Sequence, residues 1–255
     1  MAGTPGKRLR YTASRRVGST LSDLPEGVLH HIMSFLDSRQ AVQVCLLSRR
    51  WRNLWRSMPR INIDCKEFEV TDKAVFIVFV NRLLELRDPV APISKFRLWY
   101  SMTGSGCDTV KKDTGRWISH ALQKQAWAVE IYVDMFYGYL KLLLTIEDNL
   151  QWCPKFNNLV NLTLGEWCLH ANFYALIVFI ENSPRLEKLT LKLYEFGQRT
   201  SKRTIVELND RPFTCGHLKI VEVICFKNDP LANHVVDFLF SSGMTSAQIH
   251  IKHCW

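Results

Sequence analysis

The sequence lacks an apolar run long enough to cross a membrane. One of its longest such runs, "AVFIVFV" from Ala74 to Val80, is followed directly by Asn81 and Arg82, whereas a membrane-spanning helix needs about 20 apolar residues. The first twenty residues contain no apolar stretch of the signal-peptide type. We therefore expect no membrane span and no secretion, and a location in the nucleus and/or the cytoplasm.

The sequence also lacks the spacings that build metal sites and active sites. Eight cysteines are present, none paired as C-x-x-C, and most are adjacent to apolar residues, as in "EWCL" and "VICF". This pattern predicts buried free thiols rather than disulfides, and neither "TCGH" nor the terminal "HIKHC" has zinc-finger spacing. No G-x-S-x-G, H-E-x-x-H or P-loop motif occurs. We expect no catalytic residue, no metal and no cofactor.

Net positive charge is almost absent after the first sixty residues. Residues 1–60 contain 11 Lys and Arg against 3 Asp and Glu, whereas residues 61–255 contain 22 against 21. The first twenty residues are basic and free of acids, as in a transit peptide or a nuclear-import patch, but the simplest expectation is a disordered tail. Only the first sixty residues have the charge expected of a nucleic-acid surface.

Apolar residues, in contrast, are in excess between Ser22 and Ile61. Asp23 is a candidate N-cap, with Pro25 in the first turn, for a helix that ends near Phe35. One apolar stripe is enough to dock a surface helix, yet this helix has two. The first comprises Leu24, Val28, Ile32 and Phe35, and the second comprises Leu29, Met33 and Leu36.

Two further helices are expected in the same module. Asp37 or Ser38 would cap the second, over "RQAVQVCLL", and Ser48 would cap the third, in which "SRRWRNLWR" has an apolar face and an arginine face. A unit of about forty residues rarely stabilises itself without disulfides or metal, so its excess apolar surface predicts an interface. Two alternatives are that the helices begin one large fold and that the arginine face binds nucleic acid.

The rest of the chain repeats the pattern L-x-x-L-x-L. It occurs five times, as "ISKFRL", "AWAVEI", "LVNLTL", "LEKLTL" and "LKIVEV", with starts 33, 33, 27 and 32 residues apart. "INID" after Arg60 resembles an irregular opening strand, and helical segments are expected near 72–86, 114–124, 172–181 and 232–240. This alternation predicts a curved α/β solenoid with a parallel sheet. An ordinary α/β domain is the alternative.

Together these features resemble a known family. "LPEGVLHHIMSFL" and "AVQVCLLSRRWRNLW" resemble a plant-type F-box, and with the repeats the chain is similar to plant F-box/LRR proteins, including their FBD-containing C-terminal end. The resemblance implies a non-catalytic substrate receptor of an SCF-type ubiquitin ligase. Its partners would be a Skp-type adaptor, through it a cullin scaffold, and a target protein bound by the repeats. A nucleic-acid-binding regulator and a repeat scaffold that recruits nothing remain the alternatives.

The resemblance also implies a division of the α/β chain and an adaptor-binding surface. We expect a basic tail at 1–20, a three-helix F-box at 21–60, a leucine-rich-repeat solenoid at 61–210 and an FBD-like last repeat at 211–255. Members of the family usually have more repeats, so the chain is expected to be shortened near 137–154. The expected adaptor-binding residues, which the sequence does not divide into interface and core, are Leu24, Pro25, Val28, Leu29, Ile32, Leu36, Val42, Val44, Leu47 and Trp51.

Overall fold

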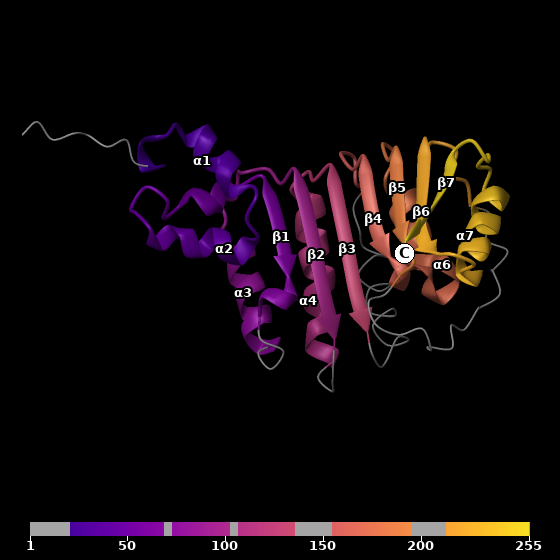
Figure 1. Ribbon diagram of the computed structural model, residues 1–255, viewed down its shortest axis with the longest axis horizontal. Coiled ribbons are helices and arrows are strands. Elements are labelled where there is room, and N and C mark those ends of the chain that lie inside the picture. The colour runs from indigo at the N-terminus through magenta and orange to yellow at the C-terminus, as the bar shows by residue number, and fades with distance from the viewer. Residues whose placement is uncertain (1–20, 69–72, 103–106, 136–154, 195–212, 255) are drawn as a thin grey trace, which may run out of the picture.

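A computed structural model describes residues 21–68, 73–102, 107–135, 155–194 and 213–254. In these residues a small helical module precedes a parallel sheet of seven strands (Figure 1). The order of the strands in the sheet follows their order in the chain. The predicted α/β class and the alternation of strands with helices are confirmed. The predicted tail at 1–20 and the predicted shortening near 137–154 lie outside the described residues.

Each L-x-x-L-x-L copy forms a strand of the sheet, with its first apolar residue just before the strand. The strands are β1 (Arg60–Asp64), β2 (Lys95–Met102), β3 (Ala128–Met135), β4 (Asn161–Gly165), β5 (Lys188–Lys192), β6 (Ile220–Phe226) and β7 (Ile249–Cys254). Successive strands are joined where they begin by a repeated hydrogen-bond pattern. For example, the backbone N–H groups of Trp127 and Ala128 both donate to the carbonyl of Ser94, at 3.1 and 3.2 Å.

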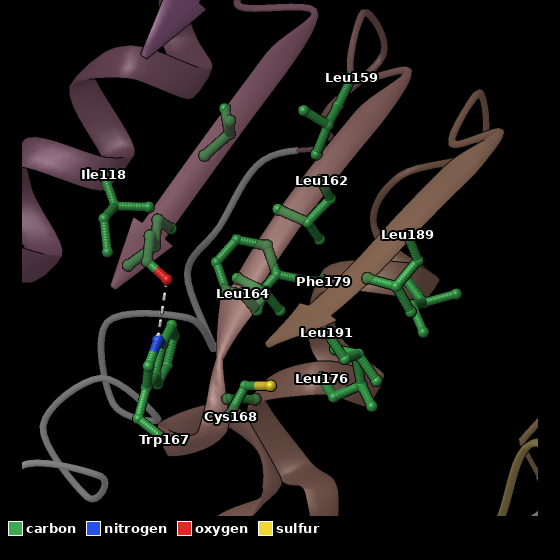
Figure 2. Close-up of a cluster of buried hydrophobic side chains, with 14 of the residues drawn as sticks. Ile118, Leu159, Leu162, Leu164, Trp167, Cys168, Leu176, Phe179, Leu189 and Leu191 are labelled. Atoms are coloured by element: carbon green, nitrogen blue, oxygen red, sulfur yellow. Dashed lines mark hydrogen bonds between the residues drawn. The ribbon is translucent and has the colours of Figure 1, made fainter. Parts of the chain in front are cut away.

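The three apolar positions of every copy form the core. They are at most 2% exposed in all five copies, from Ile93, Phe96 and Leu98 in the first to Leu218, Val221 and Val223 in the last. Figure 2 shows the middle of this core, where the indole N–H of Trp167 also donates to the carbonyl of Ile131 at 3.2 Å. Burying one leucine side chain contributes about 1.5–3 kcal/mol, so the regular leucine spacing is sufficient to drive the stacking of the repeats.

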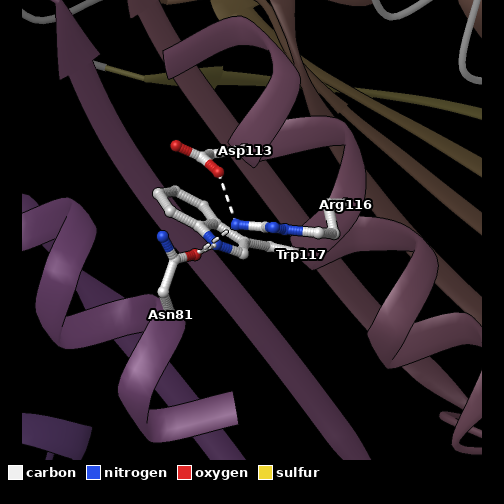
Figure 3. A network of polar contacts seen from close by, with 4 residues as sticks. All are labelled: Asn81, Asp113, Arg116 and Trp117. Carbon is white, nitrogen blue, oxygen red and sulfur yellow. Dashed lines mark hydrogen bonds and ion pairs between the residues drawn. The ribbon is translucent and has the colours of Figure 1, made fainter. Parts of the chain in front are cut away.

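Four helices supply the other half of the core. They are α3 (Lys73–Glu85), α4 (Cys107–Gln123), α6 (His170–Glu181) and α7 (Pro230–Ser241), and in Figure 1 α3 and α4 lie behind the strands. Asn81 joins α3 to α4, since its side-chain oxygen accepts from the indole of Trp117 at 2.7 Å and from Arg116 at 2.9 Å (Figure 3). All four helices were predicted, although α4 begins seven residues before the expected Thr114.

The helical module departs from its prediction at two places. It contains the 3-10 turn η1 (Leu21–Asp23), α1 (Glu26–Met33), α2 (Ser38–Gln43), η2 (Val44–Leu46) and η3 (Leu54–Ser57). Asp23 does not cap α1, because it lies inside η1 and Pro25 takes the N-cap position without a side-chain hydrogen bond. Asp37 does cap α2, in a capping box with Gln40.

The third helical segment is the short turn η3 rather than a helix that starts after Ser48. Residues 49–53 form turns, and there the guanidinium of Arg50 donates to the carbonyl of Leu24 at 2.6 Å. A helix this short has little intrinsic stability, so tertiary contacts decide the backbone conformation. The apolar residues that predicted the helix, Trp51, Leu54 and Met58, are nevertheless buried.

Candidate functional site

The helical module has a small core of its own, separate from that of the sheet. Its buried members are Leu29, Met33, Ala41, Trp51, Leu54 and Met58, each at most 8% exposed. Partly buried Leu24, Ile32, Leu36, Val44 and Trp55 pack around them. One stripe of α1, that of Leu29 and Met33, therefore closes the core. The other stripe packs Leu24 and Ile32 against this core but leaves Val28 and Phe35 exposed.

A set of large apolar side chains on the same module stays exposed to solvent. Leu46 is 88% exposed, Phe35 is 74%, Leu47 is 72%, Leu21 is 65% and Val28 is 42%. Single exposed apolar residues are ordinary, but five large ones within 27 residues are more than a surface of this size usually exposes. We call this set, Leu21, Val28, Phe35, Leu46 and Leu47, the exposed apolar set.

The structure divides the ten residues that the sequence analysis assigned to adaptor binding. Two are in the module's own core, Leu29 and Trp51. Five are partly buried: Leu24, Ile32, Leu36, Val42 and Val44. Three are exposed: Pro25, Val28 and Leu47. Their role in binding stays a prediction.

Three of the most exposed apolar residues were absent from that prediction. They are Leu21, Phe35 and Leu46. Phe35 was recognisable, because it continues the stripe of Val28 and Ile32 along α1. Leu46 was not, because exposure in a short 3-10 turn follows no helical period.

The arginines of "SRRWRNLWR" do not form a helical face. Besides the bond from Arg50 to Leu24, the Nε of Arg56 donates to the carbonyl of Leu86 at 2.7 Å. These two guanidinium groups thus hold the backbone of the module and of its junction with α3. A recognition helix would instead present its arginines together along one side. The helical arginine face that favoured nucleic-acid binding is therefore absent from this segment.

The module is docked directly on the first strand of the sheet. The backbone N–H of Asn62 in β1 donates to the Ser38 hydroxyl at 3.1 Å, and that of Asp88 donates to the carbonyl of Arg56 at 3.0 Å. Val42 and Trp55 pack against the core of the sheet. The module thus covers the β1 end of the solenoid (Figure 1), where an exposed sheet edge would otherwise face solvent.

All six described cysteines are free, as the sequence predicted, but only three are buried; Cys45, Cys65 and Cys254 are partly buried. Cys168, Cys215 and Cys225 are buried, and each is free. Burial raises the pKa of Cys168 far above its usual value and raises that of Cys215 to about 11. Such thiols stay neutral near pH 7 and are poor nucleophiles.

The described ranges contain neither a metal-binding cluster nor a membrane-spanning helix. Within them, His, Cys, Asp and Glu side chains nowhere gather in a group of three or more that could hold a metal ion. None of the described helices has the length and apolar character needed to span a membrane.

Comparison with known proteins identifies the module. The F-box domain family matches residues 21–62. The chain is 31% identical over 198 residues to an FBD-associated F-box protein of Arabidopsis thaliana, an alignment that covers 72% of this chain and 43% of the relative. It is 26% identical over 211 residues to an F-box/FBD/LRR-repeat protein of the same plant, covering 81% and 43%. The chain spans less than half the length of these curated relatives.

The fold and the module together define an α/β repeat protein with an N-terminal F-box domain. More particularly, the chain is a homologue of the Arabidopsis F-box/FBD/LRR-repeat proteins. The resemblance found in the sequence is confirmed at this level.

Proposed function

We propose that this protein is a substrate receptor of an SCF-type ubiquitin ligase. Its F-box docks a Skp-type adaptor, and through it a cullin scaffold, while its repeats hold a target protein. The observation that carries the proposal is the exposed apolar set, because it lies within the 42 residues that match the F-box and is not used by the core of the module.

The size of the exposed apolar set suits a stable complex. Burying Phe35, Leu46 and Leu47 would contribute about 5–9 kcal/mol before the costs of association, at about 1.5–3 kcal/mol for each side chain. A micromolar complex has a binding free energy of about −8 kcal/mol. The partly buried neighbours Leu24, Ile32 and Leu36 would add the remainder.

The receptor would contribute proximity rather than chemistry. A target held on the repeats meets the ubiquitin-transfer machinery at a raised effective concentration, which accelerates transfer without any catalytic group on this chain. This fits the high pKa values of the buried thiols Cys168 and Cys215. We place the protein in the nucleus and/or the cytoplasm, where free thiols persist.

The test is the affinity of the full chain for a purified Skp-type adaptor, measured by calorimetry. Leu46→Asp combined with Leu47→Asp should weaken binding by about a hundredfold or more, because two charges would be buried at the interface. Both side chains are exposed in the free protein, so the melting temperature of the double variant should equal that of the wild type.

Val90→Asp is the matched control. Val90 is 85% exposed but lies beyond the F-box, so this variant should bind as the wild type does. Equal affinity of the wild type and the double variant would contradict the proposal.

A further inference from the structure

The face of the sheet opposite the helices has an excess of positive charge. Side chains alternate along each strand, so every second residue points away from the core. Among the side chains that the structure describes, the cations on this face and at its β1 end are Arg60, Lys66, Lys95, Arg97, Lys188, Lys192 and Lys252. The carboxylates on the strands there are Asp64, Glu130 and Glu222, and Glu67 adjoins Lys66 at the β1 end. The described part of this face and of its β1 end thus carries seven cations and four anions.

The three carboxylates on the strands already take part in ion pairs or hydrogen bonds. Glu130 pairs with Lys95 at 2.5 Å and with Arg97 at 3.7 Å. Asp64 accepts from the backbone N–H of Lys66 at 2.9 Å.

The third carboxylate, Glu222, lies between two lysines. Lys188 and Lys252 each approach it at 3.0 Å. Burial raises the pKa of Glu222, but the hydrogen bonds from Lys252 and Lys188 outweigh that effect and hold its pKa below the usual value. It therefore stays ionised and paired with these two lysines.

Two aromatic rings lie within this charged face. Trp99 and Tyr132 are register partners on β2 and β3. The Nζ of Lys66 lies 4.0 Å from the centre of the Trp99 ring, and that of Lys192 lies 4.9 Å from the centre of the Tyr132 ring. Lys192 is on β5, two strands from Tyr132, and its register partner on the intervening strand β4 is Gly165.

Arg97 completes the group, with its guanidinium carbon 5.8 Å from the centre of the Tyr132 ring. We call Lys66, Arg97, Trp99, Tyr132 and Lys192 the cation–aromatic strip. Cations over aromatic faces are held in place by attraction to the negative face of the ring. The strip therefore presents three positioned cations beside two flat rings.

We propose that the cation–aromatic strip binds an extended acidic segment of a protein. Carboxylates of the segment pair with Lys66, Arg97 and Lys192, and an apolar or aromatic side chain lies against the rings. The inference rests on the proposed function only in taking the bound protein to be the target of the receptor.

Nucleic acid fits the strip less well than an acidic peptide does. Every phosphodiester link carries a charge, and a continuous row of phosphates would pass the carboxyl groups of Glu130 and Glu222, which lie among the cations. An acidic peptide has its charges at intervals and can avoid them. Charge complementarity of this kind gives specificity and association rate more than affinity.

The experiment is a selection of peptides of about 12 residues from a random displayed library on the full chain. The selected peptides should be enriched in Asp and Glu. Lys66→Glu combined with Lys192→Glu should weaken the binding of a selected peptide about tenfold or more at low salt. Lys192→Gln, which only removes one charge, should give a smaller loss in the same direction.

Arg82→Glu combined with Arg185→Glu is the matched control. It reverses two exposed charges, one on α3 and one in the turn before β5, and should leave peptide binding unchanged. A selected pool without excess acid, equal binding to the strip variant, or a preference for duplex DNA over the peptides would overturn the proposal. Adaptor affinity of the same variants separates the two proposals, because reversal of the strip should not change it.

Discussion

At the scale of single residues, the least satisfied polar groups lie where α3 and α4 end. Arg87 is only 6% exposed, and burial lowers its pKa to about 10. Its Nη2, like the Nε2 of His120, has no hydrogen-bond partner among the described residues. Burial first, and then the charges of Lys124 and Arg87, lower the pKa of His120 below its usual 6.5. The folded protein thus holds a neutral imidazole beside two cations.

This environment makes stability depend on pH. Because the folded-state pKa of His120 is lower than the unfolded value of 6.5, the unfolded chain takes up the proton first as the pH falls. The contribution of a neutral His120 is complete above about pH 6.5 and is lost as the pH falls below it. We expect the melting temperature to fall less between pH 8 and pH 5.5 in His120→Gln than in the wild type.

The exposed His31 provides the control for this measurement. His31 is stacked edge-on against Phe35 in the helical module, and His31→Gln should keep the full pH dependence of the wild type. An identical fall in melting temperature for the wild type and His120→Gln would show that the imidazole is not held neutral.

At the scale of elements, the F-box is the end cap of the sheet as well as the proposed docking module. Trp55 makes this connection, because it packs against the core of the module and against the core of the sheet. The sequence placed Trp55 on an apolar helix face but did not indicate that it contacts two cores. Contacts between elements distant in sequence are not part of a helical period, which is also why η3 was predicted as a longer helix.

Truncation of Trp55 should therefore destabilise more than the module. We expect Trp55→Ala to lower the free energy of unfolding by about 2–4 kcal/mol, near the lower end of large-to-small core substitutions because the ring is only partly buried. Urea unfolding measures the change, and hydrogen exchange should quicken in β1 as well as in α1.

Trp127→Ala is the matched control, since Trp127 is 48% exposed between two strands of the solenoid and should cost about 1 kcal/mol or less. Faster exchange in the module alone, with β1 unchanged, would mean that the F-box does not cap the sheet.

At the scale of the whole molecule, the core was predictable and the outer face was not. Each L-x-x-L-x-L copy contains all that is needed to place one strand and its buried side. The cation–aromatic strip is instead assembled across strands, with Tyr132 and Lys192 sixty residues apart in the chain. No local pattern contains that contact. β7 was missed for a related reason, because "QIHIKHC" lacks the leucine spacing and Ile251 remains 47% exposed.

The two proposed surfaces lie on different parts of the molecule, so binding at one can be measured separately from binding at the other. The exposed apolar set belongs to the F-box at the β1 end of the sheet (Figure 1), while the residues of the cation–aromatic strip come from the turn after β1 and from β2, β3 and β5. A receptor needs both surfaces accessible at once, since the adaptor and the target are bound together.

Hydrogen–deuterium exchange of the full chain with and without a saturating Skp-type adaptor tests this claim most directly. We expect slower exchange in α1, α2 and η2, the elements that carry or adjoin Val28, Phe35, Leu46 and Leu47. Exchange in β2 to β5 should not change. Slower exchange in those strands, or no change in the F-box at saturation, would contradict this claim.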